Sequence, residues 1–354
     1  MYMTANLAIP TPEAPSAEPA EGPLAVLFAG GSLSQAEAES LFGELVAGRL
    51  SEPSIAALLV ALKIKGETAD ELIGAARALR KADAPFERPN YLFADSCGTG
   101  GDGSGTINLS TAVAFVAAAA GLPVAKHGNR SVTSRCGSAD VLEHLGVRLD
   151  ASAPVSRRAL DEIGFCFLFA PNYHPGLKHA GPVRRALKVR TIMNVLGPCL
   201  NPAEPPVQLL GVAEERLLEP VALTLAALGV REAMVVHGSG LDEAAIHGET
   251  RAVRLSGGAI EPLAFSPADA GLGEAPLSSI RGGGVEENAE RLKALLLGYG
   301  TSAETRAVAL NAGVLLLTAG KAGTLREAVD LALQAIGSGS PHRILKSFIE
   351  ISDA

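Results

Sequence analysis

The chain has 354 residues, 47% of them hydrophobic and 39 of them glycine, which suffices for one large α/β core with a helical appendage. A net charge of −8, only 4% aromatic residues and no tryptophan argue against a nucleic-acid surface or a stacking platform for single strands. The four cysteines form no CxxC pair, as is typical of reduced thiols in a cytoplasmic protein, and no apolar run reaches membrane-spanning length. We therefore expect a cytoplasmic location and neither nucleic acid nor membrane as a partner.

Residues 1–22 are predicted to be a disordered tail. They carry no periodic apolar face and lack the basic start and apolar core of a signal peptide. Four prolines interrupt them, at Pro10, Pro12, Pro15 and Pro19.

Residues 23–89 are predicted to form a small all-helical domain with a linker. Ser34 with Glu37 and Thr68 with Glu71 have the spacing of capping boxes, and Ser51 precedes a third helix. The segment 55–65 is apolar on more than one face. So small a bundle cannot cover that surface alone, so it should pack on the main domain, on later helices or on a second copy of the chain.

Residues 90–354 alternate short apolar segments with helical patterns, which indicates a large α/β domain with a mainly parallel central sheet. The predicted strands are 92–95, 123–126, 165–170, 208–212 and 232–237. A crossover helix is predicted at 217–228, and a hairpin with strands 252–255 and 258–265 should turn at Gly257-Gly258. Four helices are predicted to end the chain, at 286–297, 305–318, 324–336 and 341–349.

A glycine-rich loop connects the first predicted strand of this domain to its first helix. A backbone without Cβ atoms can turn several N–H groups toward one point, and the following helix N-terminus adds partial positive charge. The loop therefore predicts a phosphate cradle. Its glycines are Gly98, Gly100, Gly101, Gly103 and Gly105, and polar side chains follow at Thr106, Asn108, Ser110 and Thr111. At a helix start these can cap the helix, bind phosphate oxygens or hold a metal ion.

The same loop fits the GxGxxG pattern of dinucleotide sites by letter. Such a site needs an acidic residue about 20 positions further on, to bind a ribose hydroxyl. Lys126 occupies that region, and no acid lies between Asp102 and Asp140. We rank a dinucleotide site low for this reason, and a ligand-free structural turn little higher.

Three other clusters follow predicted strands, where α/β sheets bind ligands. The first runs from Lys126 to Arg130. The second includes His174 and the pair Arg184-Arg185, since an arginine fork suits a planar carboxylate, although solvated or ion-paired arginines are the simpler reading for Arg185 and Arg190. The third contains Asp242 and Glu243, which are either a hard-cation site or a solvated turn.

The segments GTGGDGSGTINLST, KHGNRSVTSRCGSAD and NYHPGLKHAGPVRRALKVRTIMNVLGPCLNP resemble the anthranilate phosphoribosyltransferase family, and the match extends from about residue 23 onward. The resemblance implies a small helical domain beside a large α/β domain, a fold shared with pyrimidine nucleoside phosphorylases. It also implies a homodimer formed through the helical domain.

The implied reaction is the second step of tryptophan biosynthesis from chorismate. The phosphoribosyl group of 5-phosphoribosyl 1-diphosphate passes to the amine of anthranilate, giving N-(5-phosphoribosyl)anthranilate and diphosphate. The donor is expected on Gly98, Gly101, Asp102, Thr106, Asn108, Leu109, Ser110, Thr111, Lys126, His127, Gly128, Asn129, Arg130, Ser131, Val132, Thr133, Ser134 and Ser138. Anthranilate is expected on Gly98, Asn129, His174 and Arg184, and Mg²⁺, as two ions per subunit, on Ser110, Asp242 and Glu243. No residue is assigned as acid or base, because a neutral aromatic amine is already nucleophilic.

The chain departs from the family pattern at Thr133 and Cys136, where serine is usual, and at Lys188, where glycine is usual. Met193 replaces phenylalanine and Leu200 replaces threonine. The alternatives are a nucleoside phosphorylase, which would not need the Mg²⁺ residues, and a non-catalytic relative that binds nucleic acid, which should have lost the acidic pair and gained a basic face.

Overall fold

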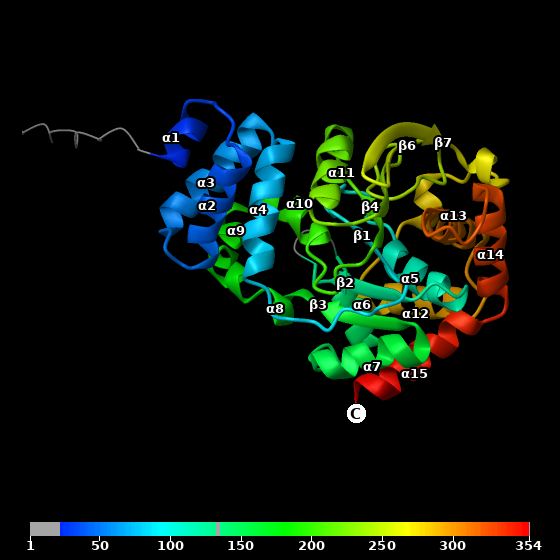
Figure 1. The fold of residues 1–354 in the computed structure, drawn as a ribbon. Helices are drawn as coiled ribbons and strands as arrows, with labels where there is room; N and C mark the ends of the chain where they lie inside the picture. The colour runs from blue at the N-terminus through cyan, green and yellow to red at the C-terminus, as the bar shows by residue number, and fades with distance from the viewer. Residues whose placement is uncertain (1–21, 132–134, 354) are drawn as a thin grey trace, which may run out of the picture.

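A seven-stranded sheet in the order β3-β2-β1-β4-β5-β6-β7 is the centre of the larger part of the molecule (Figure 1). In this computed structural model, which describes residues 22–131 and 135–353, β1 to β5 are parallel and β6 and β7 continue the sheet antiparallel. The strands are β1 (Ala94–Gly98), β2 (Val124–Gly128), β3 (Phe165–Phe169), β4 (Val207–Gly211), β5 (Glu232–His237), β6 (Thr250–Ser256) and β7 (Ala259–Phe265). The predicted α/β class with a mainly parallel sheet is confirmed.

The first two strands end later than predicted, at Gly98 and Gly128 instead of residues 95 and 126. Polar residues continue these strands inside the protein: Asp95 and Ser96 are fully buried in β1, and Lys126 is buried in β2. Strands β3 and β5 and the hairpin lie where predicted, and the hairpin turns at Gly257 and Gly258, whose φ angles are 57° and 86°.

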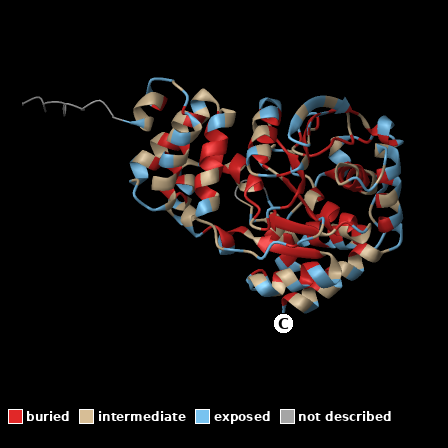
Figure 2. Cartoon of the chain, viewed as in Figure 1, coloured by how far each residue is buried: buried red, intermediate tan, exposed pale blue. Residues whose placement is uncertain are grey.

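Helices cover both faces of the sheet, because side chains along each strand alternate between two cores. Leu209, Met234 and Val236 face the core formed with α5 (Leu109–Ala119) and α13 (Ser302–Thr318), whereas Leu210 and Val235 face α11 (Leu218–Ala227). Figure 2 shows the strands as mostly buried and the outer helices as exposed on their outer faces. The remaining helices of this part are α6 (Ser138–His144), α7 (Ala153–Ile163), α8 (Ala170–Tyr173), α12 (Val285–Leu296), α14 (Leu325–Gly337) and α15 (Ser340–Ser352), with short 3₁₀ turns η1 (Pro175–His179), η2 (Glu215–Leu217), η3 (Pro267–Ala270) and η4 (Leu277–Ile280).

The first helices of the chain form the smaller part, at the opposite end of the molecule from α13 and α14 (Figure 1). They are α1 (Pro23–Phe28), α2 (Gln35–Val46), α3 (Glu52–Lys65) and α4 (Ala69–Lys81), and both predicted capping boxes are present. Two later helices, α9 (Gly181–Leu187) and α10 (Ile192–Cys199), pack on α3, and α10 also packs on α4. The apolar face of α3 is thus covered from within the chain, although Ile64 on the same helix stays 81% exposed.

The predicted tail, residues 1–22, lies outside the described residues except for Gly22. Within the part of the chain that is described, no helix is both long enough and apolar enough to cross a membrane.

Candidate functional site

The carboxyl ends of β1, β2, β4 and β5 bring the predicted clusters to one edge of the sheet. Gly98 at the end of β1 pairs in register with Gly211 at the end of β4. A Cβ on Gly211 would lie 1.6 Å from the Asp242 carbonyl oxygen, and one on Gly98 would lie 2.3 Å from the Asp242 carboxylate. The loop that carries Asp242 therefore rests directly on two strand ends, and only glycine leaves room for it. The sequence reading missed the role of Gly211.

The glycine-rich loop has the backbone of an anion cradle. Gly100, Gly101, Gly103 and Gly105 have positive φ angles of 68°, 75°, 76° and 61°, which non-glycine residues rarely adopt. The N–H of Gly100 donates to the Asp242 carboxylate at 2.6 Å. Those of Gly101, Asp102, Gly103 and Gly105 donate to no acceptor within the described residues. Unpaired N–H groups in such a turn suit the oxygens of a phosphate.

Asp242 and Glu243 form an acidic pair beside this loop. Glu243 is only 8% exposed. Burial, reinforced by the nearby charge of Asp102, raises the pKa of Asp242; burial and the neighbouring Asp242 raise that of Glu243. The backbone N–H of Ser110, in the first turn of α5, acts in the opposite direction and favours the ionised form of Glu243. The structure thus brings Ser110, Asp242 and Glu243 together around a patch of excess negative charge.

This donor set fits a hard cation that is completed by a ligand. No cluster of three or more His, Cys, Asp and Glu side chains in residues 22–131 and 135–353 could hold a metal by itself. Mg²⁺ usually takes one or two carboxylates and fills its shell with water and substrate phosphate oxygens. Two partly compensated carboxylates and a hydroxyl beside an anion cradle meet that requirement.

Lys126 lies beneath the cradle and is 1% exposed. Its ammonium donates to the Ser96 carbonyl at 2.7 Å and to the Ser110 hydroxyl at 3.2 Å. A third N–H remains for a carboxylate or a ligand oxygen. Lys126 therefore supports Ser110 from inside the sheet. Because Lys126 is part of strand β2, its side chain has little freedom to move outward with a ligand.

The segment after β2 is tied down by Asp140 of α6, which the sequence reading left without a role. Partial burial opposes ionisation of Asp140, but N–H donors from Ser131 and Gly137 and the charge of Arg130 lower its pKa. Arg130 is engaged with Asp140 and Glu143 on the surface of α6. The Arg130 guanidinium is thus turned toward protein carboxylates.

Other predicted donor-site residues frame this segment. The Asn129 carbonyl accepts from the Ser138 hydroxyl at 3.3 Å, and Gly128 leaves space for that hydroxyl. Val132, Thr133 and Ser134 lie outside the described residues.

Asn108 precedes α5 but does not cap it with its side chain, so capping, one of the roles considered for it, is not observed. Its amide donates to the Cys136 carbonyl at 3.2 Å, and its oxygen accepts from Asn288 at 3.1 Å. Thr106 forms an isolated bridge with Arg281 and so precedes the helix start. Leu109 and Thr111, which are 2% and 1% exposed, are in the first turn of α5. The start of α5 is thus held by Arg281, before α12, and by Asn288, within α12, and no sequence pattern singled out Asn288.

His174 joins β2 to the linker after α4. Its Nδ1 lies 2.5 Å from an oxygen of Asp83 and its Nε2 lies 3.0 Å from Nε2 of His127. Both histidines are 5% exposed, and burial, with the neighbouring His174 and Lys126, lowers the pKa of His127 well below 6.5. The sequence reading named both histidines but missed Asp83, which ties them to the linker between the two parts.

Arg184 is a half-buried guanidinium on α9 that makes no hydrogen bond or ion pair with any described residue. Burial alone lowers its pKa. Lys188 follows α9 with a left-handed φ of 53°. An unpaired, partly desolvated arginine is a ready site for a carboxylate.

Models of two protein families match the chain. The glycosyl transferase family α/β domain matches residues 90–342, and the glycosyl transferase family helical bundle domain matches residues 24–82.

Curated relatives match over nearly the whole chain. The anthranilate phosphoribosyltransferase of Sorangium cellulosum is 60% identical over 92% of this chain and 94% of its own length. That of Aeromonas hydrophila is 52% identical over 89% and 92%.

Solved structures agree in fold. The Thermus thermophilus anthranilate phosphoribosyltransferase superposes with a TM-score of 0.88 at 42% identity, covering 94% of this chain and 99% of that one. The Saccharomyces cerevisiae enzyme in complex with PRPP and Mg superposes with a TM-score of 0.82 at 27% identity, covering 91% and 94%. With its helical bundle, its α/β domain and these relatives, the chain belongs to the anthranilate phosphoribosyltransferase family of glycosyl transferases.

Proposed function

We propose that this protein transfers the phosphoribosyl group of 5-phosphoribosyl 1-diphosphate to the amine of anthranilate, giving N-(5-phosphoribosyl)anthranilate and diphosphate. The observation that carries the proposal is the row of unpaired N–H groups in the loop 98–105, directly beside Ser110, Asp242 and Glu243. The yeast relative that is similar in fold was solved with PRPP and Mg, and again with 4-fluoroanthranilate.

The donor diphosphate occupies the glycine-rich loop and the first turn of α5 in this proposal. The N–H groups of Gly101, Asp102 and Gly103, which donate to no acceptor in residues 22–131 and 135–353, are available for the diphosphate oxygens. The ribose 5-phosphate end lies toward the segment from Lys126 to Ser138, whose backbone Asp140 fixes.

Mg²⁺ is proposed at two positions, one on Asp242 and Glu243 and one on Ser110. Bound there, Mg²⁺ would neutralise the acidic pair and the charge that gathers on the departing diphosphate. The raised pKa values of both carboxylates support this placement, because they mark a site that lacks compensating positive charge.

Anthranilate is proposed to bind through its carboxylate to Arg184, with Asn129, Gly98 and His174 around it. Arg184 needs no rearrangement to do so, since it has no partner in the described part of the chain. Asp83 keeps the His174 ring in one orientation.

Catalysis then consists of positioning and electrostatics. As the bond from ribose C1 to the diphosphate lengthens, positive charge develops at C1, and the backbone N–H groups of the loop and Lys126 stabilise the departing oxygens. The neutral amine attacks C1 from the opposite face, and its extra proton can pass to solvent. We assign no protein group as acid or base.

We also propose the domain boundaries, the oligomeric state and the location of the protein. Residues 23–89, completed by α9 and α10, form the helical domain, and residues 90–354 otherwise form the α/β domain. A homodimer through the helical domain is supported by exposed apolar side chains there, Phe28 at 55% and Ile64 at 81%. The cytoplasm is the proposed location, supported by four free cysteines.

A nucleoside phosphorylase is disfavoured as the alternative, because it would leave the arrangement of Ser110, Asp242 and Glu243 without a use. A nucleic-acid-binding role is disfavoured by the net charge of −8.

The test follows loss of anthranilate fluorescence in the presence of phosphoribosyl diphosphate and Mg²⁺. Arg184→Gln should raise the KM for anthranilate about 10- to 100-fold, the loss of a charged hydrogen bond, while the exposed neighbour variant Arg185→Gln stays within twofold of wild type. Joint replacement of Asp242 and Glu243 by alanine should abolish Mg²⁺-dependent turnover. Absence of turnover by the wild-type protein, or equal effects at Arg184 and Arg185, would contradict the proposal.

A further inference from the structure

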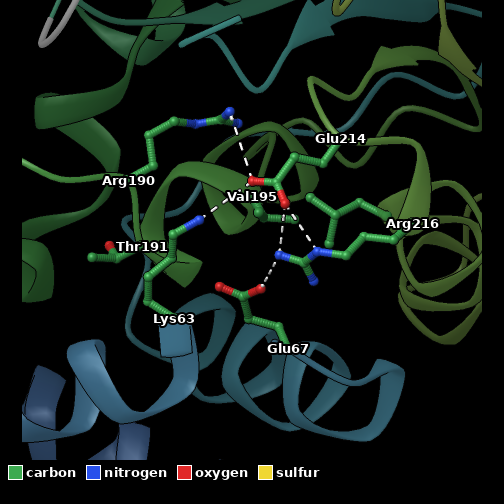
Figure 3. A pocket seen from close by; sticks show the side chains of 8 residues that line it. Lys63, Glu67, Arg190, Thr191, Val195, Glu214 and Arg216 are labelled. Atoms are coloured by element: carbon green, nitrogen blue, oxygen red, sulfur yellow. Dashed lines mark hydrogen bonds and ion pairs between the residues drawn. The ribbon is translucent and has the colours of Figure 1, made fainter. Parts of the chain in front are cut away.

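Arg190 lies at the junction of the two parts of the molecule, in the connection between α9 and α10. Figure 3 shows its side chain extended toward Glu214, with Lys63 and Arg216 grouped around the same carboxylate. The simple interpretation of Arg190 as a surface ion pair is incomplete, because its side chain is only 20% exposed and its buried Nε has no hydrogen-bond partner among the described residues.

The stem of Arg190 runs against the glycine-rich loop. A Cβ on Gly101 would lie 2.8 Å from both Cδ and Nε of Arg190, so glycine at position 101 leaves room for the Arg190 side chain to lie against the loop backbone. One Nη of Arg190 donates to the Gly101 carbonyl at 3.3 Å. Arg190 thus contacts the glycine-rich loop, a contact that the sequence did not predict.

That contact fixes the direction of one peptide group. In a trans peptide the C=O and the following N–H point in opposite directions. With the Gly101 carbonyl turned toward Arg190, the N–H of Asp102 is turned away from it, and this N–H donates to no acceptor in the described residues. Arg190 therefore orients the N–H of Asp102, one of the hydrogen-bond donors of the cradle.

Glu214 ties this arrangement to the helical part. Its carboxylate lies 3.9 Å from Arg190, 3.4 Å from Lys63 on α3 and 2.9 Å from Arg216. Arg216 in turn pairs with Glu67, just before α4, at 3.0 Å. Three cations thus share two carboxylates, and Arg190 is the member of this cluster that bonds to the loop.

The cluster is not itself a ligand pocket. The space among its side chains is about 10 Å³, at most the room for one water molecule. Its effect must therefore pass through the loop that Arg190 contacts.

We propose that Arg190 is a positioning residue for the diphosphate cradle, which holds the Gly101–Asp102 peptide with its N–H toward the ligand and links the loop to α3 through Glu214. This rests on the proposed function, since it assigns the diphosphate of the donor to the loop. The arginine contributes orientation and a share of positive field, and it forms no covalent bond.

The experiment measures binding of inorganic diphosphate with Mg²⁺ by calorimetry, next to binding of ribose 5-phosphate. Arg190→Gln should raise the Kd for diphosphate about tenfold and the KM for the donor by a similar factor. The Kd for ribose 5-phosphate and the KM for anthranilate should stay within twofold. Arg190→Lys keeps a cation that can donate to the carbonyl and should recover diphosphate binding to within about threefold of wild type.

Arg216→Gln is the matched control, because Arg216 belongs to the same ion cluster, whereas its bonds in the described structure go to Glu67 and Glu214 and none goes to residues 98–105. Its diphosphate Kd should stay within twofold. Equal losses in the Arg190 and Arg216 variants, or a loss shared equally by ribose 5-phosphate, would reduce Arg190 to a structural residue and overturn the inference. Wild-type protein that fails to bind diphosphate would overturn the proposed function, whereas equal tight binding by wild type and Arg190→Gln would overturn only this inference.

Discussion

Replacing Gly211 by alanine should lower the catalytic activity strongly while the protein stays folded. A Cβ at this position would lie 1.6 Å from the Asp242 carbonyl oxygen and 2.2 Å from its carbonyl carbon, whereas real Cβ atoms essentially never approach within 3.0 Å. The obstacle is backbone, so it cannot rotate away. The loop with Asp242 must therefore move by about 1.4 Å, or β4 must shift in the sheet.

A displacement of about 1 Å at a catalytic site can cost about 100-fold in rate, which corresponds to about 2.7 kcal/mol of transition-state stabilisation. We expect kcat/KM of Gly211→Ala to fall by about that factor. Overpacking should cost about 1–3 kcal/mol of unfolding free energy, which leaves so large a domain folded. The assay combines steady-state turnover with urea unfolding.

The control is Gly43→Ala on α2, where a Cβ would meet nothing within 4 Å. This change should stabilise the protein by about 0.5–1 kcal/mol and leave kcat/KM unchanged. If Gly211→Ala kept kcat/KM within twofold of wild type, the close approach of Gly211 to the loop that carries Asp242 would not matter for activity, and the reasoning would be wrong.

Lys188→Gly should raise the free energy of unfolding by about 0.5–1 kcal/mol, because a left-handed φ of 53° strains a residue with a Cβ; lower stability in urea unfolding would contradict this. Glu71→Ala should cost about 3 kcal/mol in the same assay, since it leaves the N–H of Leu33 and the ammonium of Lys65 without their buried carboxylate, and a loss below 1 kcal/mol would refute that. The pKa of His127 is lowered in the folded protein. As the pH falls below 6.5, this histidine is therefore protonated in the unfolded chain but stays neutral in the folded protein. Wild type should therefore lose stability relative to His127→Asn by up to about 1.4 kcal/mol per pH unit below pH 6.5, and parallel pH profiles would exclude this cause.

The sequence predicted the order and type of the elements well, because apolar runs, capping residues and turn glycines are local patterns. It misplaced the ends of β1 and β2, since it took polar residues to mark the end of a strand. Asp95 and Lys126 instead lie inside, where the buried ends of their side chains find partners: Asp95 accepts from the N–H of His127, and Lys126 donates to the Ser96 carbonyl. A single residue cannot show whether such partners exist.

The sequence motifs identified the candidate site residues but not the residues that hold them in position. Gly211, Asp83 and Asn288 act on segments that are far away along the chain, and their types are common everywhere in proteins. Arg190 was read as a surface residue because nothing nearby in sequence pointed to Gly101. Such supports follow from the crossing of loops at the edge of the sheet, which only the folded chain displays.

The order of the elements also decides how the two parts are joined. The chain passes between the helical part and the sheet three times, at residues 82–93, 170–180 and 200–206. These three covalent connections restrain rotation and sliding of one part against the other, in addition to the packing of α4 on α11. A protease that cut one connection would leave the two parts attached by the others, and a growing chain cannot finish its helical part before residue 199 has left the ribosome.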